Sequence, residues 1–287
     1  MLVIYYRNER IVQLCLKDIQ PFHDHPFVIR DDDAMKETLQ SVKDYGVIMP
    51  VIVRQTDEGC YEMISGHRRM RACELAGIDT IPAIVRDVDR DTAIIMMVDS
   101  NLQRENILPS ERAKAYKMKL DAIKRQGQRN DLTSTQSVQK LSVEKVAEEA
   151  GTNREHIRRY IRLNELSPPL QKLVDEEKMG LTPAVEISYL KPEEQALLVE
   201  TIESEQATPS FSQAKRMREL SKLGKLNDDR MLDIMMEQKK PMSNNIVLPA
   251  DKVNQYFPKS YTNEQKVTTI FRLLDVWQKR KQQSQNR

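Results

Sequence analysis

The chain has 287 residues, of which 39% are hydrophobic and 31% charged, and its formal net charge at pH 7 is +2. This near-neutral balance excludes binding through a uniformly basic surface, so any affinity for nucleic acid must come from local patches. Three cysteines without paired spacing exclude a disulfide framework, and no apolar run reaches the roughly 20 residues that span a bilayer.

The first hundred residues mix strand and helix patterns. Residues 51–54 and 61–64 are β-branched or aromatic runs around a polar turn, which predicts a hairpin, and 82–88 is a third strand candidate. Apolar residues spaced i, i+4 and i+7 predict a helix over 33–46, and a second helix follows over 66–76. With few glycines overall, we expect a helix-rich cytoplasmic protein of two or three domains.

Strand patterns almost disappear after about residue 107. A helix begins at Pro109, with Gly127 after its end, and the polar segment 127–139 is predicted to be a linker. The helix over 152–166 has Thr152 with Glu155 three residues later, which predicts a capping box. Further helix starts, each marked by a capping residue or a proline, are predicted at Ser167–Pro168, Thr182–Pro183, Pro192 and about residue 210.

The C-terminal part is divided by composition. Residues 224–245 are charged and Met-rich and are interpreted as a linker, and Thr262 with Gln265 predicts a capped final helix. One apolar stripe runs down that helix, formed by Val267, Ile270, Phe271, Leu274 and Trp277. Such a stripe is either a dimer seam or the core of a small unit.

The stretch ISGHRRMRACELAG (64–77) places several cations at the start of a predicted helix. The helix dipole makes that end positive already, so cations there are unfavourable unless an anion such as phosphate binds. Gly66 permits the close backbone approach that a phosphate-binding turn needs. The alternative is a solvated basic face on a surface helix.

A second polar cluster lies at residues 98–106, just before the next predicted helix. Asn101, Gln103 and Arg104 have the donors and acceptors that orient a nucleotide or a metal-bound phosphate. Such residues are also common in ordinary loops. His23, Asp24 and His25 are metal-capable types, but nothing near them completes a recognisable ligand spacing.

Residues 142–166 have the pattern of a helix-turn-helix. Val146, Ala147 and Ala150 are expected to pack against Ile157 and Ile161. The residues left to face outward are Asn153, Arg154, His156, Arg158, Arg159 and Arg162. In such motifs, residues at the start of the second helix contact DNA base edges, and flanking cations contact phosphates. A plain helical hairpin with a basic outer face has the same sequence pattern. Residues 104–129 add eight Lys or Arg against three acids.

Four stretches resemble, in order, blocks of the ParB-type partition proteins. They are 25–54 (HPFVIR to VIVR), 64–87 (ISGHRR to IVRD), 98–116 (VDSNLQREN to KAY) and 141–190 (LSVEKV to SYL). The resemblance implies an α+β ParB/sulfiredoxin-like nucleotide-binding domain over 1–107. It also implies an all-α helix-turn-helix domain over 108–223, and a linker with a small helical, dimerising unit over 224–287.

The resemblance also implies ligands and partners. Members of the family bind CTP with Mg²⁺ and close as homodimeric clamps on double-stranded DNA after finding a short palindromic site. A ParA-type ATPase is a further partner, although the start of this chain shows no basic peptide for it. The implied activity is at most a slow CTPase.

Residue by residue, the resemblance assigns two sets. The nucleotide set is Arg30, Gly66, His67, Arg68, Arg69, Asn101, Gln103 and Arg104. The DNA set is Thr152, Asn153, Arg154, His156, Arg158, Arg159 and Arg162. Mg²⁺ is assigned to Asn101, with Asp99 as the available carboxylate.

Two departures from the family pattern affect the metal. His67 stands where the family has Glu, and Ser100 where it has an acid before Asn101. A carboxylate is a better Mg²⁺ ligand than a hydroxyl. These departures motivate the alternative of a helix-turn-helix transcriptional regulator that binds no nucleotide. A third alternative, a phosphotransferase or nuclease on the same N-terminal fold, is suggested by the His67–Arg68 pair after Gly66.

Overall fold

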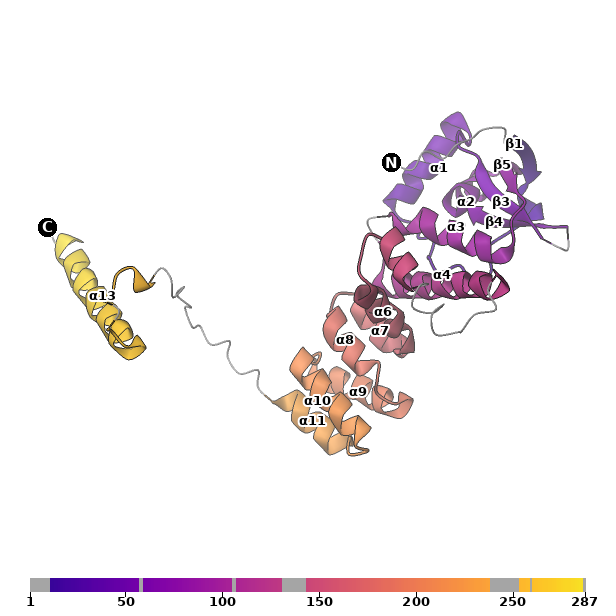
Figure 1. Cartoon of the computed structure of the whole chain (residues 1–287). Helices are drawn as coiled ribbons and strands as arrows, with labels where there is room; N and C mark the ends of the chain where they lie inside the picture. The colour runs from indigo at the N-terminus through magenta and orange to yellow at the C-terminus, as the bar shows by residue number, and fades with distance from the viewer. Residues whose placement is uncertain are drawn as a thin grey trace. The chain divides into compact units, whose positions relative to one another are not determined.

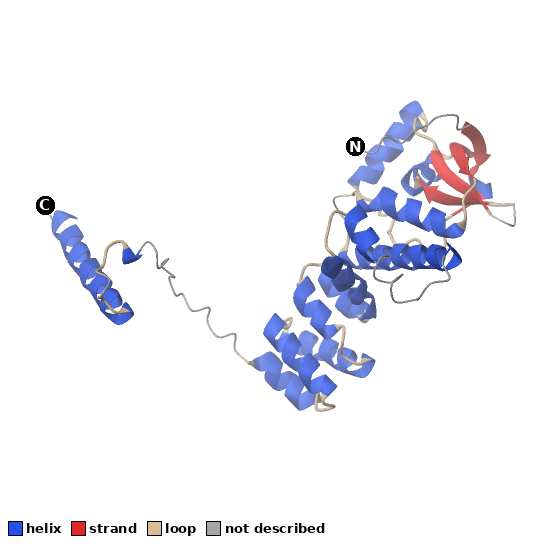
Figure 2. Ribbon diagram, in the orientation of Figure 1, coloured by secondary structure: helices blue, strands red, loops and turns tan. Residues whose placement is uncertain are grey.

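The protein, seen as a computed structural model, forms two compact units, Met1–Glu237 and Gln238–Arg287. The described residues are 11–56, 59–104, 107–130, 143–237, 253–258 and 260–285, with the backbone alone for 128–130 and 278–285. The first unit holds a sheet and most of the helices, and the second ends in one long helix (Figures 1 and 2). The predicted fold class, an α+β domain followed by helical parts, is confirmed.

A five-stranded mixed sheet forms the base of the N-terminal domain, drawn in red in Figure 2. Its strands are β1 (Ile11–Cys15), β2 (Ile19–Gln20), β3 (Val51–Gln55), β4 (Tyr61–Ser65) and β5 (Thr80–Arg86). The order is β1-β5-β3-β4-β2, in which β3 and β4 are antiparallel and β3 and β5 are parallel. The predicted hairpin and third strand are confirmed, whereas the two edge strands β1 and β2 escape prediction.

Side-chain alternation along the strands builds a core on each face of the sheet. Val51 and Val53 point into a core with α1 (Asp33–Tyr45) and α2 (His67–Ala76). On the other face, Ile64 packs against α3 (Arg90–Leu102) and α4 (Pro109–Asn130), in a core that also contains Phe22, Phe27, Ala93, Ile94, Met97, Val98, Ala115 and Ala122. Each fully buried aliphatic side chain contributes roughly 1.5–3 kcal/mol, so both helix pairs are fixed to the sheet.

The rest of the first unit is helical. The helices are 143–149, α6 (Arg154–Arg162), α7 (Pro168–Asp175), α8 (Leu181–Ile187), α9 (Pro192–Glu205), α10 (Phe211–Lys222) and α11 (Asp228–Met236), with short 3-10 turns η1 (Leu16–Asp18) and η2 (Leu163–Glu165). Leu163, Leu170, Ile187, Leu198 and Met217 are buried in their common core. The start of α7, with Pro in its first turn, agrees with the prediction.

Three local predictions are wrong. The helix α4 runs through Gly127 to Asn130, so 127–130 is not linker, and residues 131–139 lie outside the described chain. The N-cap of α6 is Asn153, not Thr152. The helix α8 starts one residue early, at Leu181, so Thr182 is not its cap.

The interpretation of 224–245 as a linker is wrong for the middle of that segment. There α11 begins after the N-cap Asn227, whose side chain accepts a hydrogen bond from the backbone N–H of Arg230. Met231, Ile234 and Met235 recur at helical spacing and are buried in the same core as α9 and α10. The proposed linker residues 241–245 lie outside the described chain.

The second unit is built around α13 (Asn263–Gln285). Its predicted capping box is confirmed: the backbone N–H of Thr262 donates to Oε1 of Gln265 at 2.9 Å, and the N–H of Gln265 to Oγ1 of Thr262 at 3.3 Å. The predicted stripe is largely exposed, with Phe271 at 64% and Trp277 at 60%. Among the described helices none is both long and apolar enough to cross a membrane.

Candidate functional site

The turn at Gly66 connects β4 directly to α2. Gly66 has φ 116°, and a Cβ there would lie 2.5 Å from Cγ1 of Val51, so both backbone angle and packing require glycine. The first turn of α2 has neither a side-chain cap nor an acidic residue. Its N–H groups and the positive end of its dipole are therefore available to an anion, as the sequence predicts.

The two arginines that follow His67 have different roles. Nη2 of Arg68 lies 2.7 Å from Oδ1 of Asp32, the N-cap of α1, and this hydrogen bond lowers the pKa of Asp32. Nη1 of Arg69 donates to the carbonyl oxygens of Met49 and Pro50, at 2.5 and 2.7 Å. Arg68 thus lies at the α1 end of the site, whereas Arg69 fixes the loop before β3.

A cavity of about 720 Å³ lies beside this turn and collects four residues of the predicted nucleotide set. They are Arg30, Arg68, Gln103 and Arg104, from three separate parts of the chain. Its other lining residues are Phe27, Val28, Asp32, Ala34, Ile107 and Glu111. Three guanidinium groups facing one space make it suited to a polyanion.

Arg104 lines the cavity without an ion-pair partner in the described chain. Burial lowers its pKa first, and the neighbouring Arg68 lowers it further. Glu111, the carboxylate that raises the pKa of Arg104, already accepts hydrogen bonds from the backbone N–H groups of Val28 at 2.9 Å and Leu108 at 3.2 Å. Within the described chain, the side chains of Arg104 and Arg30 make neither a hydrogen bond nor an ion pair, so both are available to a ligand.

His67 does not face the cavity directly but contacts His25. The two ring centroids are 4.0 Å apart, and the Nε2 atom of each ring is buried with no hydrogen-bond partner in the described chain. Burial lowers the pKa of His67 to about 3, with further lowering from His25 and Arg104. The imidazole that replaces the family's Glu is therefore neutral near pH 7.

The predicted metal ligands are not brought to one site. Asn101 is buried in α3, where its Nδ2 donates to the carbonyl of Met97 at 2.8 Å and its Oδ1 has no partner in the described chain. Asp99 instead forms an ion pair with the buried Lys119 and lines another cavity. No group of three His, Cys, Asp or Glu suited to a metal occurs among the described residues. The donor set therefore does not make a Mg²⁺ site of its own.

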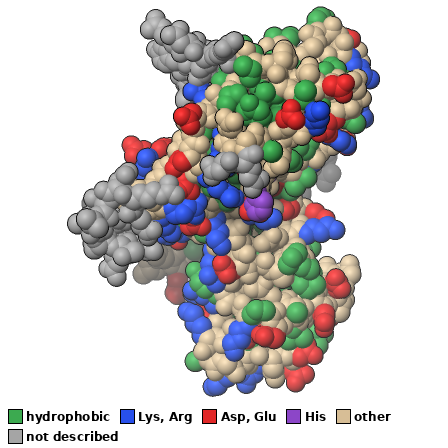
Figure 3. All heavy atoms as spheres, turned by 90° about the vertical axis from the view of Figure 1, so that its right-hand side faces the viewer, with side chains coloured by type: hydrophobic (Ala, Val, Ile, Leu, Met, Phe, Trp, Pro, Cys, Tyr) green, Lys and Arg blue, Asp and Glu red, His purple; other side chains and the backbone are tan. Residues whose placement is uncertain are grey.

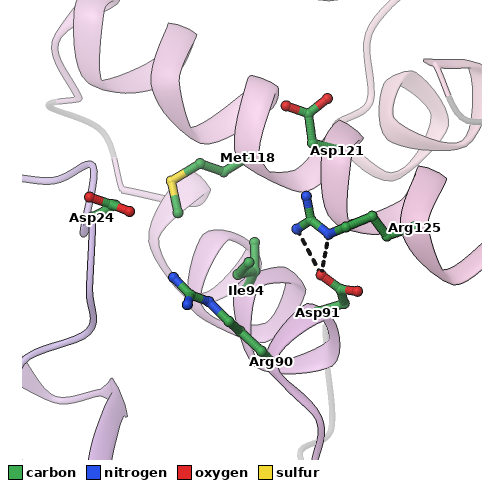
Figure 4. Close-up of a pocket in the computed structure, with 7 residues that line it drawn as sticks. All are labelled: Asp24, Arg90, Asp91, Ile94, Met118, Asp121 and Arg125. Atoms are coloured by element: carbon green, nitrogen blue, oxygen red, sulfur yellow. Dashed lines mark hydrogen bonds and ion pairs between the residues drawn. The ribbon is translucent and has the colours of Figure 1, made fainter.

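A further cavity, of about 440 Å³, lies between α3 and α4 and contains none of the predicted site residues (Figure 4). Nε and Nη2 of Arg125 lie 2.8 and 2.7 Å from one oxygen of the buried Asp91. This pair ties the end of α4 to the start of α3. Its charges are satisfied within the protein, so we assign it a structural role.

The helix-turn-helix packs as predicted. Val146, Ala147 and Ile157 are buried together, with Ala150 and Ile161 against them. The helix α4 closes this small core with Tyr116, Leu120 and Ile123. The helix 143–149 and α6 are therefore held on α4, which also packs on α3 of the N-terminal domain.

Five members of the predicted DNA set lie on α6 and two precede it, Thr152 and the N-cap Asn153, and several members have partners within the protein. Nη1 of Arg154 lies 2.6 Å from Oε1 of Glu144, and Nη2 of Arg159 donates to Oγ1 of Thr182 at 2.6 Å. Asn153 caps the helix through the N–H of His156, at 2.8 Å. These contacts hold the start of α6 and its arginines in fixed positions.

Arg162 is held most firmly of all. It donates to Oγ and to the carbonyl oxygen of Ser188, at 3.1 and 2.7 Å, and its guanidinium lies 4.1 Å from the ring centre of Tyr189. Arg218 from α10 lies over the same ring at 3.7 Å and pairs with Glu186. Arg162 thus joins α6 to α8 and α10.

Arg158 differs from its neighbours. It is exposed, and in the described chain its side chain makes no hydrogen bond or ion pair. On the face in Figure 3, Lys and Arg side chains are interspersed with Asp and Glu rather than gathered in one basic surface. The basic character expected of residues 104–129 is also reduced, because Lys119 is buried and Arg125 is paired.

Sequence reasoning misses residues whose role depends on contacts between distant segments. Lys119 counts in the sequence as a surface cation, and no local pattern singles out Tyr189, Arg218 or Glu111. His25 is recognisable only as a metal-capable type. The imidazoles at 25 and 67 can be paired only by knowing that the loop before α1 meets the start of α2.

Two family models match the chain, the ParB N-terminal domain over residues 5–102 and the ParB HTH domain over residues 105–222. A probable chromosome-partitioning protein ParB from Neisseria meningitidis is 33% identical over 61% of this chain and 55% of its own length. A nucleoid occlusion protein from Halalkalibacterium halodurans is 34% identical over 69% of this chain and 64% of its own length. The chain thus spans less than two thirds of these relatives.

Solved structures of ParB proteins are also similar. C-terminally truncated ParB from Caulobacter crescentus, complexed to the centromeric parS site, has 20% identity and a TM-score of 0.43, covering 72% of this chain and 98% of that one. The same protein complexed with CTP-γ-S has 22% identity and a TM-score of 0.31, covering 67% and 98%. Because the two domain models match in order and the curated relatives agree with them, this chain belongs to the ParB family.

Proposed function

We propose that this chain is a sequence-specific DNA-binding protein that responds to CTP and acts in DNA partition or in the regulation of a plasmid or mobile element. The observation that carries the proposal is the cavity beside Gly66, where Arg30, Arg68 and Arg104 face one space. The names of the curated relatives, which concern chromosome partitioning and nucleoid occlusion, support a role on DNA. The choice of CTP follows the family resemblance.

The chemistry of the cavity favours a triphosphate. Arg30 and Arg104 are exposed, and within the described chain their guanidinium groups make no hydrogen bond or ion pair, so bidentate hydrogen bonds to phosphate can form without breaking an existing contact. Arg104 and Arg30 would bind phosphate oxygens, Arg68 would add charge, and the N–H groups after Gly66 would cradle one phosphate. Gln103 would orient the ligand. Any Mg²⁺ would arrive with the nucleotide and be held mainly by phosphate oxygens.

The DNA site is proposed on α6. Arg158 is an exposed cation that is free to reach DNA bases or phosphates. Arg159 and Arg162 are held in place by their bonds to Thr182 and Ser188 and would contact the phosphate backbone of the DNA. A palindromic site requires two copies of the chain, and we propose that the exposed stripe of α13, including Phe271 and Leu274, joins them in a homodimer.

One observation favours the rival of a nucleotide-independent regulator. Asp99, the carboxylate nearest the missing acid of the family motif, is held by Lys119 rather than facing the arginine-lined cavity. A pocket without a metal-binding carboxylate can bind triphosphate weakly or not at all. The enzyme alternative has no such support, since the described chain contains no cluster of carboxylates arranged for metal-assisted hydrolysis.

Calorimetric titration of the full chain with CTP, ATP and GTP, each with and without Mg²⁺ and DNA, tests the proposal. We expect selective binding of CTP. If no nucleotide binds while the protein is folded and binds DNA, the nucleotide-independent regulator is the correct function.

A further inference from the structure

Two histidines from separate segments meet immediately next to the arginine-lined cavity. His25 lies in the loop between β2 and α1, and His67 is the first residue of α2, with ring centroids 4.0 Å apart at 47°. Two nearby residues of the same segments, Phe27 and Arg68, line the cavity. The imidazole pair is therefore part of the site's immediate surroundings.

The hydrogen bonds fix where a proton can be added. Nδ1 of His25 lies 2.7 Å from the carbonyl oxygen of Phe27, which only an Nδ1–H can satisfy. Nε2 of His25 is then the basic atom of the neutral ring. Nε2 of His67 is likewise buried without a partner in the described chain. Each ring thus presents an unsatisfied nitrogen, a feature that native structures seldom leave unused.

Burial first, and then the charges around the pair, keep it neutral when the cavity is empty. Arg104 disfavours protonation of both rings, and His25 disfavours protonation of His67. Glu111 acts in the opposite direction on His25, but its carboxylate is engaged by two backbone N–H groups. Burial is the largest single effect, and it lowers the pKa of both histidines.

We propose that His25 and His67 form a proton-accepting pair that is neutral in the empty site and takes up one proton when a nucleoside triphosphate binds. The inference rests on the proposed nucleotide binding. A triphosphate bound in the cavity offsets Arg104, the cation that now opposes protonation of both rings, and adds negative charge of its own. Repulsion between the two rings limits the uptake to one proton.

Thermodynamic linkage gives the consequence. If nucleotide binding favours protonation, protonation favours nucleotide binding by the same factor, so affinity must rise as pH falls. Protonation of the nucleotide's own phosphate has the opposite effect on affinity, because it removes negative charge from the ligand. Tighter binding at lower pH would therefore indicate protonation of the protein rather than of the nucleotide. CTP affinity would then rise as pH falls through the pKa that the protonated ring has in the complex.

Histidine-selective ¹⁵N labelling and NMR test this directly, because the chain has only four histidines. We expect the imidazole nitrogens of His25 and His67 to show neutral patterns without ligand, and one of the two to shift to the protonated pattern with saturating CTP. Calorimetry in two buffers of different ionisation enthalpy should show uptake approaching one proton per site. Kd should be severalfold lower at pH 6 than at pH 8.

The matched variants are the double substitution His25→Gln with His67→Gln, and the control His23→Gln, whose side chain is 72% exposed. The double variant should bind CTP without proton uptake and with a Kd that no longer decreases at low pH, whereas the control should behave as the wild type. CTP binding by the wild type with both rings remaining neutral would overturn the inference and leave the proposed function standing. No CTP binding at any pH would overturn both.

Discussion

At the level of single residues, position 66 of the site has the strictest requirement for one amino acid, glycine. Its φ of 116° and the 2.5 Å that would separate an added Cβ from Val51 are independent reasons for glycine. Gly77, at the other end of α2, also has positive φ, 70°, but open space around it. Substituting alanine at Gly77 therefore measures the cost of backbone strain alone, whereas substitution at Gly66 measures strain together with overpacking.

We predict that Gly66→Ala lowers the free energy of unfolding by about 2–4 kcal/mol, the sum of a positive-φ penalty and overpacking. Gly77→Ala should cost only about 1–2 kcal/mol, from the backbone alone. Urea denaturation of the two variants measures both. Equal losses would mean that the contact with Val51 relaxes freely and that packing at this turn is not strict.

Much of the pocket is predictable from the sequence at this scale, because its residues lie in compact motifs. The family resemblance assigns Arg30, Arg68 and Arg104, and the structure brings all three to one cavity. The role of Asp99 is not predictable, since it depends on Lys119, twenty residues away on another helix. The predicted cap of α6 is misplaced by one residue because Thr152 and Asn153 are both good N-cap types.

At the element scale, Lys119 joins three helices. This residue on α4 is 1% exposed, and its Nζ pairs with Asp99 on α3 and lies 2.6 Å from Oε2 of Glu149 on the helix 143–149. The first helix of the helix-turn-helix is thereby connected to the helix that carries Asn101. A buried cation held by two half-exposed carboxylates is stable only while both remain.

We predict that combining Asp99→Asn with Glu149→Gln destabilises the protein by about 3–5 kcal/mol, because Lys119 stays buried without a partner. Adding Lys119→Met should recover most of this loss, since no buried charge is left. Lys117→Met, at an exposed position on the same helix, is the matched control. Thermal unfolding compares these variants with the wild type. A triple variant no more stable than the double would refute the role given to Lys119.

Elements are predictable where the local pattern agrees with packing. The helices over 33–46 and 66–76 are identified because periodicity and end signals coincide. Gly127 resembles a helix end, but one glycine costs a helix only about 1 kcal/mol, and the contacts of Arg125 with Asp91 hold the end of α4 in place. The helix α11 escapes prediction because its charged residues outweigh the buried spacing of Met231, Ile234 and Met235.

At the scale of the whole molecule, the proposed palindromic DNA site would require two copies of the chain. The stripe on α13 is an extended exposed apolar feature of the second unit, with Phe271, Leu274 and Trp277 each more than half exposed. An apolar stripe of this kind is stable in water when a second helix covers it. The sequence alone leaves both a dimer contact and an intramolecular core open and slightly favours the dimer, and the exposure of the stripe within its own unit also favours the dimer contact.

We predict that Leu274→Glu converts a dimer into a monomer without changing the unfolding of the first unit, because a buried charge is not tolerated at a helix seam. Arg272→Glu, on the opposite side of the same helix, should remain dimeric. Sedimentation equilibrium measures both. A wild-type chain that is monomeric at micromolar concentration would show that α13 is not the dimer contact.

We propose that this chain carries two separable sites, a nucleotide cavity and a DNA-binding helix. The affinities of the variants Arg68→Ala and Arg158→Ala for CTP and for DNA test this separation. We predict that Arg68→Ala loses CTP binding but keeps initial recognition of its DNA site. Arg158→Ala should weaken DNA binding by about 1–3 kcal/mol and leave CTP affinity unchanged. If each variant loses both activities to the same extent, the assignment of two sites is contradicted.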